Sequence, residues 1–353
     1  MELADAFDSF PPDLTHPGKP KEHMLSVFKV ATVVGLGLVG PQIAVVLAQG
    51  SERLQVYDRD PAVAQRAILD MRDYVAEIFR HDLLIGDPHE VLARIQLAST
   101  LEEAVSGSEF VLEAISENID AKQELYRELD RITPPEITIA SNTSTIPIRH
   151  MAEVCAHPGR VVGSHFYLPA HILPLVEVIK HPHVDEEHVS RTYDAWAAMG
   201  KVPILVNTDI VGFVANRLQH SLTRQAIELA VDGVASVEDI DNAVRFSFGA
   251  RFLSLGPLAS RDLGGIMNHA KVASYLYREL DANGDTAVRR LQEMSDRGDD
   301  GLRTLKGFYD WEGDPEELRS YHYERMIEQT KRLRDIGGIR TSLSNSEDTA
   351  SDD

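Results

Sequence analysis

The sequence predicts an α/β protein in which an N-terminal doubly wound sheet is followed by an all-helical C-terminal domain. Three observations lead to this fold class. Short β-rich runs alternate with helical patterns over residues 27–208, which is typical of a parallel sheet covered on both faces. A glycine-rich turn joins the first of these runs to the first helix. Beyond residue 208 the strand pattern stops and helical periodicity continues.

The elements of the first domain, residues 27–208, follow in order along the chain. Strands are predicted at FKVATVVG, LQVYD, IQLA, EFVLEAI, ITIA, VVGSHF and the apolar run Leu173–Ile179. Helices are predicted from Pro41 to about Gly50, over residues 61–80, and where Ala121, Leu125, Leu129 and Ile132 recur at helical spacing.

The second domain is predicted over residues 209–338. Its clearest helix carries an apolar stripe at i, i+4 spacing, closed by Gly233 as a C-cap; the stripe consists of Val214, Leu218, Leu222, Ala226 and Ala230. Residues 1–26 contain several prolines and are predicted to form an N-terminal arm. Residues 339–353 are polar and acidic and are predicted to be a disordered tail.

Composition restricts the class of protein. A net charge of -21 over 353 residues argues against a nucleic-acid binder, which needs a basic footprint, and against docking on anionic lipid. The single cysteine, Cys155, excludes an intrachain disulfide and fits a reducing compartment. No uncharged apolar run reaches the length of a membrane span, and the N-terminus lacks a signal-peptide core. A cytoplasmic protein is therefore expected.

A GxGxxG motif follows the first predicted strand and opens the first predicted helix. The first glycine permits the tight turn, the second lets the backbone approach a pyrophosphate, and the third lets helix and strand pack closely. The free N–H groups of the helix N-terminus then face the anion. This context predicts a dinucleotide site, the alternative being a glycine-rich turn in another kind of α/β protein. The predicted residues are Gly35, Leu36, Gly37, Leu38, Val39 and Gly40.

Asp58 ends the second predicted strand, 23 residues after Gly35. A carboxylate at this position accepts hydrogen bonds from both ribose hydroxyls and repels a 2′-phosphate. The sequence therefore predicts NAD rather than NADP as the cofactor. The neighbouring Arg59 weakens this preference a little.

A glutamate interrupts an apolar run that otherwise reads as a strand. Glu177 lies twelve residues after His165, and an ionised carboxylate removed from water is costly unless it is paired. A histidine near neutral pH suits the removal of a hydroxyl proton, and a buried carboxylate on its other ring nitrogen fixes the tautomer. The alternative is a core histidine whose hydrogen bonds are satisfied, with Glu177 accepting from a local N–H group.

Six motifs give a family resemblance that extends from about residue 29 to residue 312. The chain resembles the L-3-hydroxyacyl-CoA dehydrogenase superfamily in GSHFYLPAHILPLVEVI, LEAISENIDAKQEL, SNTSTIPI, GFVANRL, GPLASRDLGG and GFYDW, which keep the family's order. The segment FSFGARFLSLGPL is closer to the relatives that act on free hydroxy acids, such as L-gulonate 3-dehydrogenase (lambda-crystallin) and L-carnitine dehydrogenase.

The resemblance implies a role for each matching residue. His165 would be the general base and Glu177 its orienting partner. Ser144 would hydrogen-bond the substrate oxygen and Asn216 would bind near the reacting group. The NAD ribose-nicotinamide part would be contacted by Glu117 and Lys122. Without the family, Ser144 is equally a turn residue, Asn216 a helix-start amide and Lys122 part of a solvated face.

Two departures from the family pattern matter. Leu168 stands where the family usually has an asparagine that helps to hold the cofactor. No lysine occurs from residue 30 to residue 121, and residues 59–95 hold five arginines against seven acids, which makes a poor surface for polyanionic CoA. A compact free acid is therefore expected, with Arg251 as the cation that binds its carboxylate; Arg251 is alternatively a surface or interface residue.

We therefore predict an NAD-dependent dehydrogenase that interconverts a small-molecule 3-hydroxy acid and its 3-keto form, without a metal and as a homodimer. One alternative is a 3-hydroxyacyl-CoA dehydrogenase, such as one for 3-hydroxybutyryl-CoA. A further alternative is a non-catalytic, crystallin-like NAD-binding protein, which would be expected to have lost the His165–Glu177 pair.

Overall fold

The computed structural model describes residues 26–252 and 311–336, together with scattered positions between 256 and 310. The chain divides into two compact units, Met1–Leu218 and Gln219–Asp353. The predicted tail, and the predicted N-terminal arm up to residue 25, lie outside the described residues.

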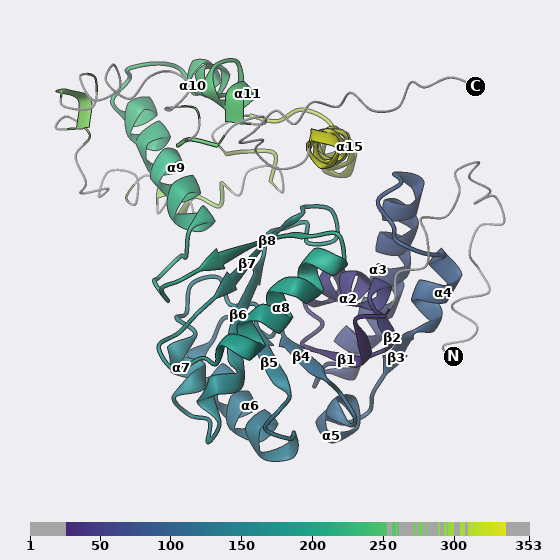
Figure 1. Cartoon of the computed structure of the whole chain (residues 1–353). Coiled ribbons are helices and arrows are strands. Elements are labelled where there is room, and N and C mark those ends of the chain that lie inside the picture. The colour runs from purple at the N-terminus through teal and green to yellow at the C-terminus, as the bar shows by residue number, and fades with distance from the viewer. Residues whose placement is uncertain are drawn as a thin grey trace, which may run out of the picture. The chain divides into compact units, whose positions relative to one another are not determined.

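A single eight-stranded sheet forms the centre of the first unit, in the order β3-β2-β1-β4-β5-β6-β7-β8 (Figure 1). Neighbouring strands are parallel except for the antiparallel pair β6 and β7. The order turns back at β1, which lies between β2 and β4 and creates the switch point where such sheets bind ligands. The strands are β1 (Phe28–Val34), β2 (Ser51–Tyr57), β3 (Ile95–Leu97), β4 (Phe110–Glu113), β5 (Thr138–Ser141), β6 (Val161–Phe166), β7 (Leu175–Ile179) and β8 (Val202–Val206).

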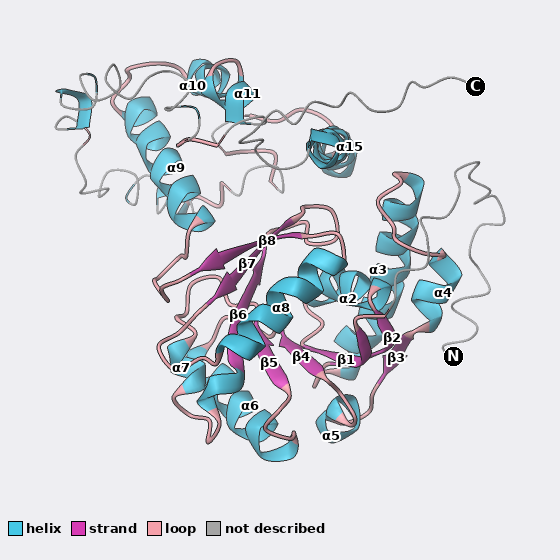
Figure 2. Cartoon of the chain, in the orientation of Figure 1, coloured by secondary structure: helices cyan, strands magenta, loops and turns pink. Residues whose placement is uncertain are grey.

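Helices connect the strands of the first unit and cover both faces of its sheet (Figure 2). They are α2 (Gly40–Gln49), α3 (Pro61–Arg80), α4 (Pro88–Ala93), α5 (Leu101–Val105), α6 (Ile119–Ile132), α7 (Arg149–Ala152), the short 3-10 turn Pro158–Arg160, and α8 (Glu186–Ala198). Capping residues in the local sequence determine where several of these helices begin. Asp60 caps α3 by accepting from the Ala62 amide, and Asn118 caps α6 by accepting from the Ala121 amide.

Side-chain alternation along β6 shows which helices lie on each face. The Trp196 indole of α8 donates to Ser164 at 2.8 Å and packs edge-on against Phe166. Residues 161, 163 and 165 point to the opposite face, because neighbouring residues of a strand alternate. There Val161 belongs to a core cluster with residues of α6 and α7, namely Tyr126, Leu129, Met151 and Ala152. His165 therefore lies on the α6 and α7 side of the sheet.

The structure confirms the predicted fold class and differs from the expected elements in the direction of one strand and in several elements that were not expected. The predicted sheet was parallel throughout, whereas β7 runs antiparallel to β6. Helices α4, α5, α7 and α8 and strand β8 were not predicted. The exposed and buried residues of β8 do not alternate strictly, so the strand lacks the period-2 signal on which sequence prediction depends.

The second unit contains the helices α10 (Val237–Arg245), α11 (Phe248–Phe252) and α15 (Pro315–Ile336). Helix α9 (Ala215–Val231) begins in the first unit and continues into the second. Gly233 follows α9 with a φ of +66°, which confirms the predicted C-cap glycine. Leu218 and Leu222 of the predicted apolar stripe are exposed in the single chain.

Candidate active site

The glycine-rich loop joins β1 to α2 and has the backbone shape that its glycines predict. Gly35 has a φ of +94°, and a Cβ added there would lie 2.6 Å from the Ile115 amide nitrogen. A Cβ at Gly40 would lie 1.9 Å from the Gly35 carbonyl oxygen, whereas a Cβ at Gly37 would meet nothing within 4 Å. Gly35 and Gly40 thus serve close packing, and Gly37 leaves the open approach that a pyrophosphate needs. These residues fit a dinucleotide.

Asp58 lies beside this loop, directly after β2. Its Oδ2 accepts the Leu36 amide at 2.7 Å and its Oδ1 accepts the Asp60 amide at 2.9 Å. The carboxylate therefore braces the glycine-rich loop itself, a contact that the sequence did not indicate. Each carboxylate oxygen offers a second lone pair for a ribose hydroxyl.

The antiparallel register explains the twelve-residue spacing between His165 and Glu177. The two residues are directly opposite one another on β6 and β7. His165 Nδ1 lies 2.8 Å from Glu177 Oε2, and both side chains are buried. Cross-strand neighbours on one face meet in this way, so the hairpin itself builds the pair. With Nδ1 turned to the carboxylate, Nε2 is the ring nitrogen left for chemistry.

The second oxygen of Glu177 binds the start of α9. Glu177 Oε1 accepts the Val214 and Ala215 amides, each at 2.9 Å. Burial raises the pKa of the Glu177 carboxyl, but the hydrogen bonds from His165, Ala215 and Val214 outweigh it and leave the pKa below its usual value. The carboxylate is thus held ionised, as an orienting partner for an imidazolium must be.

Two aromatic rings enclose His165. Tyr167 packs edge-on at 4.8 Å between ring centroids, and its hydroxyl donates to Glu177 Oε2 at 3.4 Å. Phe213 lies at 5.6 Å and is fully buried, with a φ of +45° that is unusual for a bulky residue. Sequence reasoning missed both residues, and the "FVAN" motif gave the only signal for Phe213.

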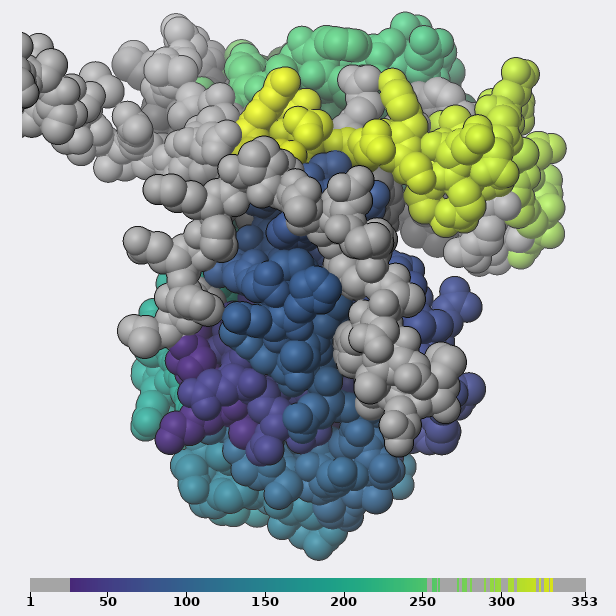
Figure 3. Space-filling model, turned by 90° about the vertical axis from the view of Figure 1, so that its right-hand side faces the viewer, coloured from purple at the N-terminus to yellow at the C-terminus, as the bar shows by residue number. Residues whose placement is uncertain are grey.

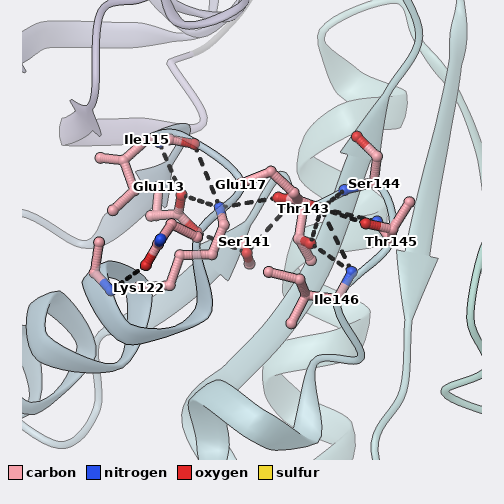
Figure 4. Close-up of polar contacts among 11 residues, drawn as sticks. Glu113, Ile115, Glu117, Lys122, Ser141, Thr143, Ser144, Thr145 and Ile146 are labelled. Atoms are coloured by element: carbon pink, nitrogen blue, oxygen red, sulfur yellow. Dashed lines mark hydrogen bonds and ion pairs between the residues drawn. The ribbon is translucent and has the colours of Figure 1, made fainter.

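Glu117 organises the loop that follows β5 (Figure 4). Its Oε1 accepts hydrogen bonds from the Thr143 hydroxyl at 2.7 Å and from the Ser144 and Thr145 amides at 3.0 and 2.9 Å. Burial raises the pKa of this carboxyl, but the hydrogen bonds and the nearby Lys122 have the larger effect and lower the pKa to about 2. Glu117 therefore fixes the backbone that carries Ser144.

Lys122 is paired inside the protein rather than solvated. Its ammonium lies 2.5 Å from Glu113 Oε1 and 3.5 Å from Glu117 Oε2, and only 1% of its side chain is exposed (Figure 4). Glu113 also accepts from the Ser141 hydroxyl at 2.7 Å. The alternative of a solvated lysine is thus wrong. The buried Lys122 ammonium needs the Glu113 carboxylate beside it, because an unpaired charge removed from water is strongly destabilising. Glu113 was not singled out from the sequence.

Ser144 and Asn216 come together across the site. Asn216 Nδ2 donates to the Ser144 carbonyl oxygen at 3.5 Å, and both residues are half-buried. The loop that carries Ser144 also reaches β6, where Asn142 Oδ1 accepts the Phe166 amide at 2.8 Å next to His165. The structure thus brings together His165, Glu177, Ser144 and Asn216.

Leu168 and Arg251 are two further residues that the sequence singled out. Leu168 is 45% exposed in the loop after β6, preceding a cis peptide bond to Pro169. Arg251 is exposed on α11 of the second unit. Among the described residues no cluster of three or more histidine, cysteine or acidic side chains could hold a metal ion. No helix in the described part of the chain is both long and apolar enough to cross a membrane.

The doubly wound sheet, the glycine-rich loop at its switch point and the buried histidine–carboxylate pair define a nicotinamide-dependent dehydrogenase. Comparison with known proteins gives the family. Residues 30–210 match the 3-hydroxyacyl-CoA dehydrogenase NAD binding domain, and residues 212–311 match the C-terminal domain of the same family. The chain therefore belongs to the 3-hydroxyacyl-CoA dehydrogenase family, and it is an NAD-dependent enzyme that acts on a CH–OH group.

Its relatives differ in what their names describe. A 5-formyl-3-hydroxy-2-methylpyridine 4-carboxylate 5-dehydrogenase from Mesorhizobium japonicum is 32% identical over 83% of this chain and 93% of its own length. A probable 3-hydroxybutyryl-CoA dehydrogenase from Bacillus subtilis is 34% identical over 80% of this chain and 98% of its own. An L-carnitine dehydrogenase from Streptomyces coelicolor is 34% identical over 66% of this chain and 72% of its own.

A crystal structure of a 5-formyl-3-hydroxy-2-methylpyridine 4-carboxylic acid 5-dehydrogenase, described as an NAD+ dependent dismutase, has a TM-score of 0.76 with this chain. It is 29% identical, with 88% of this chain and 99% of that chain covered. Lambda-crystallin is also similar to this protein. These comparisons confirm the family resemblance and the cofactor predicted from the sequence.

Proposed function

We propose that the protein interconverts a compact 3-hydroxy acid and its 3-keto form, with His165 as the general acid–base group. The single observation that carries this proposal is the His165–Glu177 pair, buried on the sheet that also holds the NAD-binding loop. NAD accepts the hydride from the carbon that bears the hydroxyl group. His165 Nε2 takes the hydroxyl proton, while the Nδ1–H group continues to donate to Glu177.

The neighbouring polar groups suit the oxygen of the reacting carbon. The Ser144 backbone is fixed by Glu117, which leaves its hydroxyl free to turn toward a substrate oxygen. Asn216 is held at the start of α9, whose preceding amides bind Glu177. Both residues are thus positioned by carboxylates whose pKa values lie below their usual range, so the arrangement stays charged at neutral pH.

Local charge favours a free acid over a CoA thioester. In the segment from residue 59 to residue 95, Arg66 pairs with Asp70, Arg72 with Asp73 and Arg94 with Glu90. The side of the first unit that this segment forms faces the viewer in Figure 3. Its arginines are offset by neighbouring acids, so it does not provide the positive field that a polyanion needs. The name of the Mesorhizobium relative describes a carboxylate without CoA.

A 3-hydroxyacyl-CoA substrate is the second candidate, and the name of the Bacillus subtilis relative supports it. A panel of substrates separates the two: 3-hydroxybutyrate, L-gulonate, L-carnitine and 3-hydroxybutyryl-CoA, each with NAD and read by NADH absorbance. Higher kcat/KM for a free acid supports the proposal. Higher kcat/KM for the thioester overturns it, and turnover of none would favour the non-catalytic, crystallin-like alternative.

We further propose that the protein is a cytoplasmic homodimer. Leu218 and Leu222 on α9 expose apolar surface that a second copy of the chain could cover. Light scattering coupled to gel filtration gives the mass, and a single-chain mass of 39.2 kDa over the working concentration range would contradict the dimer.

A further inference from the structure

His171 is a buried histidine that the proposed reaction does not use. It lies in the loop between β6 and β7, six residues after His165, and only 1% of its side chain is exposed. Both of its ring nitrogens face acceptors: Nε2 lies 2.8 Å from Glu77 Oε2 on α3, and Nδ1 lies 3.2 Å from Gln42 Oε1 on α2. The Tyr74 ring packs against the imidazole at 4.4 Å between centroids.

Gln42 connects this histidine to the NAD-binding loop. The Ala170 amide donates to Gln42 Oε1 at 2.7 Å, which fixes the oxygen end of the side chain, because a backbone N–H group can only donate. Gln42 Nε2 then donates to the carbonyl oxygen of Leu38, inside the glycine-rich loop, at 3.1 Å. One buried amide thus holds both the loop after β6 and the loop that approaches the cofactor.

The same segment is held from a second side. Lys201 Nζ donates to the carbonyl oxygens of Ala170 and Leu173, at 2.6 and 3.0 Å. An apolar side chain at position 171 would fill the same space without the cost of burying an imidazole. The pattern of contacts therefore indicates a precise position for the loop, beyond the filling of a core.

We propose that His171 is a positioning residue: through Gln42 and Glu77 it fixes the loop that follows β6 against the glycine-rich loop, and so holds His165 in register with the bound cofactor. The inference rests on the proposed function, in which His165 is the base. Misplacement of a reacting group by about 1 Å can lower a rate roughly 100-fold, so a small movement of this loop is expected to be visible in kcat.

Three variants of the full-length protein separate the two contacts of the imidazole. His171→Phe keeps an aromatic ring against Tyr74 and removes both ring nitrogens. His171→Asn places an amide donor near the position of Nδ1 and can still reach Gln42, whereas His171→Gln places it near Nε2 and can still reach Glu77. His188→Phe is the matched control, because His188 is also buried and bonded, to Thr138, but lies on α8.

Hydrogen exchange of the peptide that contains Ala170, NAD affinity by calorimetry, and kcat are measured for each variant. We expect His171→Phe to speed exchange about 10-fold, to raise the Kd for NAD about 3- to 10-fold, and to lower kcat about 10- to 100-fold. We expect His171→Asn to restore NAD affinity more fully than His171→Gln does. Exchange and NAD affinity equal to wild type in all three variants would overturn the inference, as would equal losses in His188→Phe.

The exchange and NAD measurements need no turnover, so they remain decisive even if His165 is not the base. That separate question is answered by His165→Ala. Wild-type kcat in His165→Ala would remove the proposed function, and faster exchange with weaker NAD binding in His171→Phe would still show that the imidazole joins the two loops.

Discussion

Replacing Glu177 with glutamine tests the pair directly, because an amide cannot do what this carboxylate does. Glu177 Oε2 receives His165 Nδ1, and Oε1 receives two backbone amides, those of Val214 and Ala215. Glutamine has one oxygen and one NH₂ group. Two backbone donors hold the amide oxygen more strongly than one imidazole does, so the NH₂ group is expected to turn toward His165.

The imidazole then changes tautomer. Facing an NH₂ donor, Nδ1 must accept, and the ring proton moves to Nε2, the nitrogen that should take the hydroxyl proton. A wrong tautomer of this kind in a serine-protease triad lowers kcat about 10⁴-fold. We expect Glu177→Gln to lower kcat about 10³- to 10⁴-fold, which corresponds to roughly 4–5.5 kcal/mol of activation free energy.

The assay is kcat at saturating NAD across pH, beside NAD affinity by calorimetry. Affinity is expected to change little, because Glu177 does not belong to the glycine-rich loop. Glu186→Gln is the control, since its carboxylate is exposed and pairs with Lys180 rather than with His165. A Glu177→Gln enzyme within 3-fold of wild-type kcat would refute the tautomer argument and return the pair to a structural role.

Four further outcomes follow from the sequence and the structure. His165→Ala should lower kcat about 10²- to 10⁴-fold with NAD affinity nearly kept, measured by NADH absorbance and calorimetry; unchanged turnover would rule out His165 as the base. Asp58→Asn keeps an acceptor for the Leu36 amide but removes the charge, so the ratio of kcat/KM for NAD to that for NADP should fall. Asp58→Ala should lower the same ratio and also weaken NAD binding. An unaltered ratio in both variants would count against the role of Asp58. Arg251→Ala should raise KM about 10- to 150-fold for a free acid and leave its uncharged amide unaffected, and equal effects on both would make Arg251 structural. Glu117 has a folded pKa of about 2, below its usual value of 4.5, so its contribution to stability is present above pH 4.5 and is lost as the pH falls toward 2. Between pH 4.5 and pH 2 the unfolding free energy of Glu117→Gln should therefore fall by about 1–2 kcal/mol less than that of the wild type, allowing for solvent screening. Parallel curves of stability against pH for the two proteins would show that the carboxylate contributes nothing.

Sequence reasoning located the parts of the fold that have strong local signals. The helix at Pro61–Arg80 and the C-cap glycine after α9 were found because capping residues and periodicity mark them. The reversed direction of β7 was not found, because strand direction depends on long-range pairing and leaves no local pattern. The same reversal is what sets His165 opposite Glu177, so the two residues could be found from the sequence, whereas the geometry that joins them could not.

In the candidate site, too, local motifs could be predicted from the sequence and long-range contacts could not. The GxGxxG context predicted the loop shape, but the bond from the Leu36 amide to Asp58 depends on how β1 and β2 lie side by side. Glu113 looks like an ordinary strand residue, and only the fold shows that it pairs with Lys122. Gln42 and His171 are 129 residues apart along the chain, and no spacing rule would have joined them.

The bond between Glu177 and the start of α9 sets a limit on how this enzyme can be cut and recombined. A fragment that ended with the last strand, at Val206, would lack Val214 and Ala215 and would leave Glu177 Oε1 without its two donors. The buried ring of Phe213 would also be lost from beside His165. A chimera that borrows a helical domain from a relative should therefore be spliced after Leu218, where the first compact unit ends, so that the host chain keeps its own first turn of α9.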